Sequence, residues 1–263
     1  MKFNRIGVFD SGIGGLTVLR ELLSLVPHTD MIYLGDCARL PYGTKSPKTV
    51  IRYSLQCAEF VVSKGIDIMV VACNTASAHA IPNLEKEFAM PVFGVIEAGA
   101  RAAVRTGAEK IGVIATPATI KSGAYETTLK TINPNLKIYT KACPLFVPLV
   151  EEGLFDDEVT DIIARRYLDS LINSDIQTLL LGCTHYPLMK GLLARIMGTD
   201  ITVVDSALSI ASTIAGMVEP GDRKSKSRIV EYYLTDISPR FIELGSLFLG
   251  HEMEYVYEVD LGV

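Results

Sequence analysis

Short apolar runs alternate with longer amphipathic segments along most of the chain. The runs predict strands at residues 5–10, 30–36, 67–73 and 91–97, and again at 110–116, 136–142, 178–183 and 201–206. Their near-continuous Val, Ile and Leu content is what strands buried on both faces require. Segments between them, such as 14–26 and 46–65, predict helices, the second opening with Ser46 and Pro47 at N-cap and N1 positions. The alternation predicts an α/β protein with parallel sheets and helices on both faces.

The two sets of four strands resemble a diverged repeat. IGVFDSG, from residue 6, matches IGVIATP, from residue 111, and VVACNT, from residue 70, matches LLLGCTH, from residue 179. The sequence therefore predicts two similar α/β lobes related by pseudo-symmetry, with an active site in the cleft between them. We assign residues 1–98 together with 208–263 to the first lobe, and residues 99–207 to the second.

The C-terminal tail continues the pattern. Residues 208–218 predict a helix, and the polar stretch 219–227 separates it from further elements at 228–236, 237–250 and 252–261. We expect these elements to complete the first lobe rather than form a third domain.

Composition narrows the classes of protein. The chain has 263 residues, 49% apolar and 21% charged, with a net charge of −5 and no Lys/Arg run longer than two. The sequence has no concentrated run of positive charge of the kind that indicates a nucleic-acid-binding surface. The start lacks a signal-peptide pattern, and no apolar run approaches the ~20 residues that span a bilayer. We expect a cytoplasmic protein without a membrane partner. Its five widely spaced cysteines fit neither a disulfide framework nor C-x-x-C metal pairs, and we expect reduced thiols.

Polar side chains gather where the predicted strands end, which is where parallel α/β sheets bind ligands. The first lobe offers Asp10, Ser11, Asp36, Cys73, Asn74, Thr75 and Glu97, and the second offers Thr116, Cys183, Thr184, His185 and Asp205. If the two lobes face each other, Cys73 and Cys183 lie on opposite walls of one cleft.

Two facing thiols can act as one base and one acid. A helix start just beyond each cysteine would lower the thiol pKa, whereas a nearby acidic residue such as Asp10 would raise it, and the sequence leaves the balance open. A carbon acid held between the thiols would lose a proton on one face and gain one on the other. That operation inverts a stereocentre without a metal, a cofactor or a redox change.

The neighbouring side chains suit a small amino dicarboxylate. Neutral donors for carboxylate oxygens come from Ser11, Asn74, Thr75, Thr116, Thr119 and Thr184. Asp10 and Glu151 are candidates to pair with an ammonium group or assist a cysteine, and His185 to orient Cys183.

Plainer interpretations stand beside these. A single cysteine at a strand end is often only a packing residue, and Asp10 is also a plausible turn residue before a helix. His185 near Cys183 is compatible with a metal site or a cysteine–histidine nucleophile, but no further ligands sit at zinc-like spacing. FDSGIGG departs from the dinucleotide-binding G-x-G-x-x-G pattern. His79, within a predicted helix, is expected to be structural, and the Pro41–Gly43 turn matters only if it lies beside the cleft.

Five motifs in order resemble the signatures of bacterial glutamate racemases: FDSGIGGLTV, LPYGTKS, ACNTASA, CPLFVPLVEEG and GCTHYPL. The resemblance runs from the first strand to beyond Asp205. It implies interconversion of L- and D-glutamate without a cofactor, supplying D-glutamate for peptidoglycan.

The resemblance also assigns roles to positions. It implies that Cys73 takes the proton from D-glutamate and Cys183 takes it from L-glutamate. The assisting residues would be Asp10, Glu151 and His185, and substrate contacts would come from Asp10, Ser11, Pro41, Tyr42, Gly43, Asn74, Thr75, Thr184 and His185, with Thr116 and Thr119 as further candidates. Because the chain starts just before its first strand, we do not expect the N-terminal extension of activator-dependent members. A homodimer is a further expectation.

Three rivals remain. The first is an aspartate racemase of the same superfamily, which shares the paired thiols. The second is a non-catalytic, two-lobed amino-acid binding protein, which needs neither cysteine. The third is a pyridoxal-phosphate racemase, which requires a Schiff-base lysine, and no lysine sits at a predicted strand end facing the cleft.

Overall fold

The computed structural model describes residues 3–218 and 228–262. Its strands are β1 (Arg5–Asp10), β2 (Asp30–Gly35), β3 (Ile68–Val71), β4 (Val92–Gly94), β5 (Lys110–Ala115), β6 (Lys137–Ala142), β7 (Thr178–Gly182), β8 (Thr202–Asp205), β9 (Val230–Leu234) and β10 (Val256–Glu258). Its α-helices are α1 (Leu16–Leu25), α2 (Pro47–Ser63), α3 (Asn74–Glu87), α4 (Val95–Arg105), α5 (Pro117–Ser122), α6 (Ala124–Ile132), α7 (Phe146–Glu151), α8 (Glu158–Ile172), α9 (Lys190–Met197), α10 (Ala207–Ala215) and α11 (Pro239–Leu249). Three short 3₁₀ turns are η1 (Cys37–Arg39), η2 (Tyr42–Thr44) and η3 (Tyr186–Met189).

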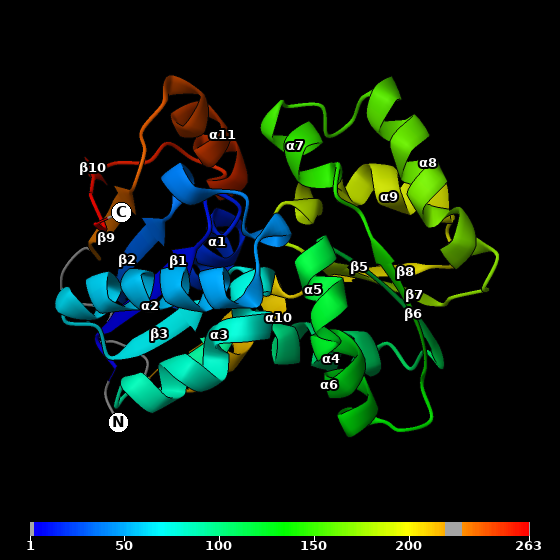
Figure 1. Cartoon of the computed structure of the whole chain (residues 1–263), viewed down its shortest axis with the longest axis horizontal. Coiled ribbons are helices and arrows are strands. Elements are labelled where there is room, and N and C mark those ends of the chain that lie inside the picture. The colour runs from blue at the N-terminus through cyan, green and yellow to red at the C-terminus, as the bar shows by residue number, and fades with distance from the viewer. Residues whose placement is uncertain (1–2, 219–227, 263) are drawn as a thin grey trace.

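The strands form two separate parallel sheets with the same internal order. The first sheet runs β10-β9-β2-β1-β3-β4 and the second runs β6-β5-β7-β8. The order 2-1-3-4 of the first four strands therefore recurs in strands β5 to β8, so β3 and β7 hold equivalent places. Figure 1 shows the two sheets as separate lobes, with helices on both sides of each. The predicted fold class, two similar parallel α/β lobes, is confirmed.

Sequence patterning explains why the strands are central. Every residue of β3 and of β7 is buried, as both faces of a parallel sheet must be when helices cover them. The predicted cap of α2 is present as well, because the Ser46 side chain accepts a hydrogen bond from the Thr49 N–H and Pro47 occupies the first turn.

The C-terminal tail extends the first sheet. β9 pairs in parallel with β2, β10 pairs with β9, and α11 packs on α1. Helix α10 contacts both α1 and α4, so it lies between the lobes, as Figure 1 also shows. The polar stretch 219–227, expected to separate α10 from the tail, lies outside the described residues. The exact division at residues 98 and 207 stays a prediction.

All five cysteines are buried and unpaired, as expected. Across residues 3–218 and 228–262, no helix has the length and apolar character needed to cross a bilayer.

Candidate active site

The carboxyl ends of β3 and β7 bring two thiols to one cavity. Cys73 lies two residues beyond β3 and Cys183 one residue beyond β7. Both side chains are buried, and both line a small cavity between the lobes. The cavity measures about 30 Å³, which is room for roughly two water molecules. A larger ligand therefore requires the lobes to move apart before it can enter.

Most of the residues expected to contact substrate line the same cavity. The lining consists of Ser11, Leu40, Pro41, Tyr42, Gly43, Cys73, Asn74, Thr75, Thr116, Val147, Cys183, Thr184 and His185. Asp10, Thr119 and Glu151 do not line it and instead stand behind residues that do. Two further lining residues, Leu40 and Val147, were not predicted. Both lie in motifs quoted above, but an apolar side chain carries no signal of a binding role.

Cys73 is surrounded by one acid and several hydrogen bonds. It caps the N-terminus of α3, where its Sγ accepts from the Ala76 N–H at 3.4 Å and donates to Ser11 Oγ at 3.5 Å. Burial, followed by the charge of Asp10, raises the pKa of Cys73 to about 12, although the two hydrogen bonds lower it in part. The question left open by the sequence is thus decided by desolvation, because the low-dielectric cavity penalises the thiolate more than the helix start favours it.

The second thiol does not have the α-helix start that we expected just beyond it. A 3₁₀ turn, η3, begins at Tyr186, and α9 follows only at Lys190. The residues just beyond Cys183 face the first lobe, where Thr184 Oγ1 donates to Asp10 Oδ1 and the His185 ring packs on Phe248. Cys183 instead has a histidine for a neighbour.

His185 and Glu151 form a buried pair beside Cys183. Nε2 of His185 lies 3.0 Å from Oε1 of Glu151, and the ring packs edge-on against Phe248 of α11. Burial lowers the pKa of His185, but hydrogen bonds to Cys183 and Glu151 and the negative charge on both outweigh it, raising the pKa to about 10. The raised pKa therefore favours the protonated form of the His185 ring beside Cys183.

Asp10 is the charged residue near Cys73, as the His185–Glu151 pair is near Cys183. Its side chain is fully buried and accepts hydrogen bonds from the Gly12 N–H at 3.1 Å and from Thr184 Oγ1 at 3.4 Å. Burial raises its pKa, while the charge of His185 and these hydrogen bonds oppose the shift. Because Thr184 belongs to the second lobe, this contact also joins the lobes.

Hydroxyl and amide groups close the cavity on a further side. Thr75 Oγ1 of α3 lies 3.0 Å from Thr116 Oγ1 and 3.1 Å from Thr119 Oγ1, both at α5. Tyr125 Oη donates to Asn74 Oδ1 at 2.6 Å, and Asn74 Nδ2 is buried without a partner in the described part of the chain. An unpaired buried donor beside a cavity is what a site for an anionic ligand provides. No local pattern pointed to Tyr125, because it lies within helix α6 and meets Asn74 only through the fold.

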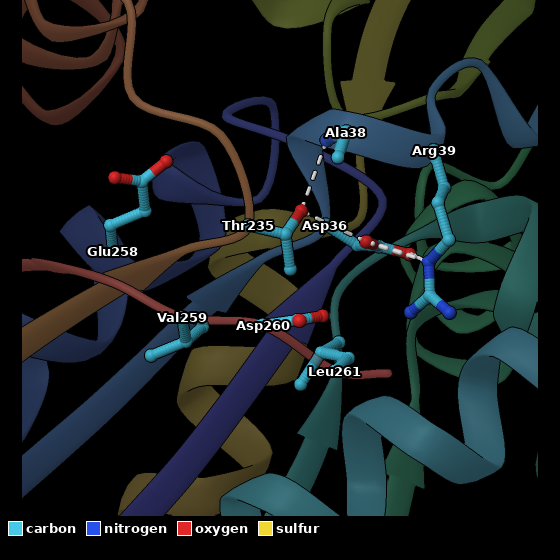
Figure 2. Close-up of a pocket in the computed structure, with 8 residues that line it drawn as sticks. All are labelled: Asp36, Ala38, Arg39, Thr235, Glu258, Val259, Asp260 and Leu261. Atoms are coloured by element: carbon cyan, nitrogen blue, oxygen red, sulfur yellow. Dashed lines mark hydrogen bonds and ion pairs between the residues drawn. The ribbon is translucent and has the colours of Figure 1, made fainter. Parts of the chain in front are cut away.

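Three carboxylates expected at strand ends lie away from the thiols, and the expectation is wrong for Glu97, because β4 ends at Gly94 and Glu97 lies in the first turn of α4. Asp36 faces a separate pocket of about 260 Å³, where it accepts from Arg39 Nε at 2.7 Å and Thr235 Oγ1 at 3.0 Å. Figure 2 shows this pocket, with Glu258 to Leu261 of the C-terminal segment opposite Asp36. Glu97 is exposed and pairs with Arg101, and Asp205 pairs with Lys190.

Comparison with known proteins gives the class of this chain. A model of the family described as Asp/Glu/Hydantoin racemase matches residues 6–214, and the chain belongs to this family.

Individual relatives are closely similar over their full length. The glutamate racemase of Geobacter metallireducens is 48% identical, covering 99% of this chain and 98% of its own. That of Aquifex pyrophilus is 47% identical over 94% of this chain and 95% of its own. The crystal structure of glutamate racemase from Francisella tularensis in complex with D-glutamate has a TM-score of 0.91 and 39% identity, covering 98% of both chains. The resemblance to glutamate racemases seen in the motifs is confirmed.

Proposed function

We propose that this protein interconverts L- and D-glutamate, using Cys73 and Cys183 as its two acid–base groups. The observation that carries the proposal is the placement of both thiols, from equivalent strand ends, on one cavity. The match to curated glutamate racemases over nearly the whole chain supports glutamate as the substrate.

The reaction moves one proton off the α-carbon and another onto its opposite face. From D-glutamate, the Cys73 thiolate takes the α-proton and becomes a thiol, while the Cys183 thiol gives its proton to the other face and becomes a thiolate. From L-glutamate the two exchange roles. The base needs strength because an amino-acid α-proton is weakly acidic, and the high pKa of Cys73 makes its thiolate a strong base.

The assisting groups are placed to serve one thiol each. Asp10 faces Cys73 and the His185–Glu151 pair faces Cys183. We infer that the imidazolium of His185 offsets negative charge on the Cys183 side, and that Asp10, from behind the cavity wall, attracts the substrate ammonium electrostatically. An ammonium group next to Asp10 also compensates the charge that raises the Cys73 pKa.

Neutral donors hold the carboxylates in this proposal. Asn74 Nδ2 has no hydrogen-bond partner among the described residues, and Thr75, Thr116 and Thr184 line the cavity. The substrate carboxylates are ionised, so hydrogen bonds from these neutral groups are charge-assisted. Each is worth about 1.5–3 kcal/mol.

The alternatives make different demands on the site. A pyridoxal-phosphate racemase needs a Schiff-base lysine, and no lysine is among the cavity-lining residues in the described part of the chain. A non-catalytic binding protein needs neither thiol at the cavity. Aspartate racemisation would use the same groups, and substrate preference separates it.

A chiral assay of the purified protein tests the proposal. We expect inversion of L-glutamate without added pyridoxal phosphate or metal, much weaker inversion of L-aspartate, and loss of activity with a thiol-blocking reagent. Activity that survives thiol blocking, or that chelation alone abolishes, would contradict it. In the cell, the product D-glutamate would supply peptidoglycan synthesis. The cytoplasmic location and the homodimer stay predictions from the sequence.

A further inference from the structure

A larger groove adjoins the thiol cavity. It lies between η2 and the start of α2 in the first lobe and α5 in the second, and measures about 670 Å³. Gly43 lines both the groove and the cavity, and Pro117 of the groove follows Thr116 of the cavity. The two spaces are therefore neighbours.

A thin contact between the lobes separates the groove from the cavity. A Cβ placed on Gly43 would lie 2.6 Å from the Thr116 Cβ, so these residues are already in close contact. Thr116 also hydrogen-bonds Thr75 across the lobes at 3.0 Å. Moving α5 away from α3 and η2 would open the cavity into the groove.

The groove is positively charged although the protein is not. Lys45 and Lys121 line it from opposite lobes, and no carboxylate is among its lining residues in the described part of the chain. Within residues 3–218 and 228–262, neither lysine takes part in an ion pair. His79, also on the groove, has a buried Nε2 with no hydrogen-bond partner among residues 3–218 and 228–262. The chain as a whole carries −5.

We propose that this groove is the vestibule through which the dicarboxylate substrate reaches the thiols, and that Lys45 and Lys121 attract it there by their charge. This inference rests on the proposed function. Glutamate carries a net negative charge, and a protein of net charge −5 repels it at long range. Two unpaired lysines at the entrance reverse the local sign within the Debye length of about 10 Å at 0.1 M salt. Clefts lined by one sign of charge raise local ligand concentration and association rates by about 10- to 10³-fold.

The role is distinct from that of the groups in the cavity. Neither lysine lines the thiol cavity, so neither touches the reacting atoms. Their removal should change how readily glutamate is captured, and should leave the proton transfers unchanged. Lys45 and Lys121 therefore act on KM and kcat/KM rather than on kcat.

The test compares two double variants with equal loss of charge. Lys45→Gln with Lys121→Gln removes the vestibule charges. Lys86→Gln with Lys137→Gln is the control, because these exposed lysines lie at the C-terminal end of α3 and the N-terminal end of β6, one in each lobe and away from the groove. At low ionic strength we expect the vestibule variant to raise KM for glutamate about three- to tenfold with kcat retained. Added salt should lower kcat/KM of the wild type and of the control, and should leave the vestibule variant nearly unchanged.

Charge reversal and restoration complete the test. Lys45→Glu with Lys121→Glu should raise KM further than the glutamine pair, and Lys45→Arg with Lys121→Arg should restore wild-type values. Equal KM and equal salt dependence in the vestibule and control variants would overturn the inference. Calorimetric titration with D-glutamate separates this failure from failure of the proposed function, because it reports capture whether or not turnover occurs. A wild type that neither binds nor racemises glutamate would overturn both.

Discussion

Tyr125 of the second lobe donates a hydrogen bond of 2.6 Å to the side-chain oxygen of Asn74 in the first. The bond fixes the orientation of the Asn74 amide, so that its NH₂ group is the part left without a protein partner at the cavity. The Tyr125 hydroxyl of the second lobe therefore orients the Asn74 NH₂ donor of the first lobe toward the cavity.

This relationship predicts a selective effect of Tyr125→Phe. The variant loses one net hydrogen bond, about 0.5–1.5 kcal/mol, and frees the amide to rotate. We expect KM for glutamate to rise about two- to tenfold, with a smaller change in kcat and a modest fall in melting temperature. Tyr139→Phe, a change to a half-buried tyrosine of β6, is the control for loss of a hydroxyl. Steady-state kinetics in both directions measure the effect, and an unchanged KM would show that the amide needs no such support.

Removing a hydrogen-bond donor to the substrate should lower kcat/KM more than changing the orientation of that donor. Asn74→Ala or Thr184→Val removes a hydrogen bond to a charged substrate group, so we expect kcat/KM to fall roughly 10- to 150-fold. Circular dichroism and thermal melting should show that both variants remain folded. Wild-type kinetic constants in both would mean that these residues do not contact substrate.

The paired thiols predict loss of both directions at once. Either Cys73→Ser or Cys183→Ser should lower racemisation by at least about 10²-fold from either enantiomer, because each thiol is the base in one direction and the acid in the other. The double variant should be little worse than the worse single one, since groups that act as a unit are non-additive. In deuterated water, mass spectrometry should find deuterium at the α-carbon of the inverted product. Cys143→Ser serves as the control, because this buried cysteine does not line the cavity and its thiol bonds to the Lys141 carbonyl. Near-normal racemisation by either cavity variant would contradict the two-base mechanism.

Asp10 should set the pH dependence on the Cys73 side. Its negative charge is a cause of the raised Cys73 pKa, second to burial. Asp10→Asn should therefore lower that pKa from about 12, so that the thiolate forms at lower pH. We expect the rise of kcat/KM with pH, measured from D-glutamate, to shift to lower pH even if its maximum falls. The thiolate absorbance of the free enzyme, with Cys73→Ser as the blank, gives the pKa directly, and an unchanged or higher value would refute the assignment.

The His185–Glu151 pair predicts a pH dependence of stability. The pKa of His185 is raised from 6.5 to about 10 in the fold. A raised pKa contributes stability that is fully present below about 6.5 and lost as pH rises through about 10. Glu151→Gln removes part of the cause, so its loss of unfolding free energy relative to wild type should be largest near pH 6.5 and shrink toward pH 10. Urea unfolding across this range measures it. A difference that grows with pH would have the wrong sign.

The sequence by itself determined the strands, the two-lobed architecture and the candidate residues. Buried parallel strands need continuous Val, Ile and Leu, and the functional side chains sit directly after those strands, so local patterns locate both. The equivalence of β3 and β7, from which the two thiols project, was visible as a repeat of short motifs. The five motifs, found in the same order, also indicated the family.

Only the tertiary structure decided how those residues meet. Whether the Cys73 thiol is acidic or basic depends on its burial and on the approach of Asp10, and desolvation is a property of the packed cavity rather than of neighbours in sequence. Tyr125 reaches Asn74 from 51 residues away, and Lys45 and Lys121 share a groove only because the lobes face each other. Asp36 follows β2 just as Cys73 follows β3. Asp36 nevertheless lines a different pocket, which the C-terminal segment that joins the first sheet helps to form. Strand ends can be read from local hydrophobicity, whereas distances between them, and the electrostatics that depend on those distances, are fixed when two lobes pack together.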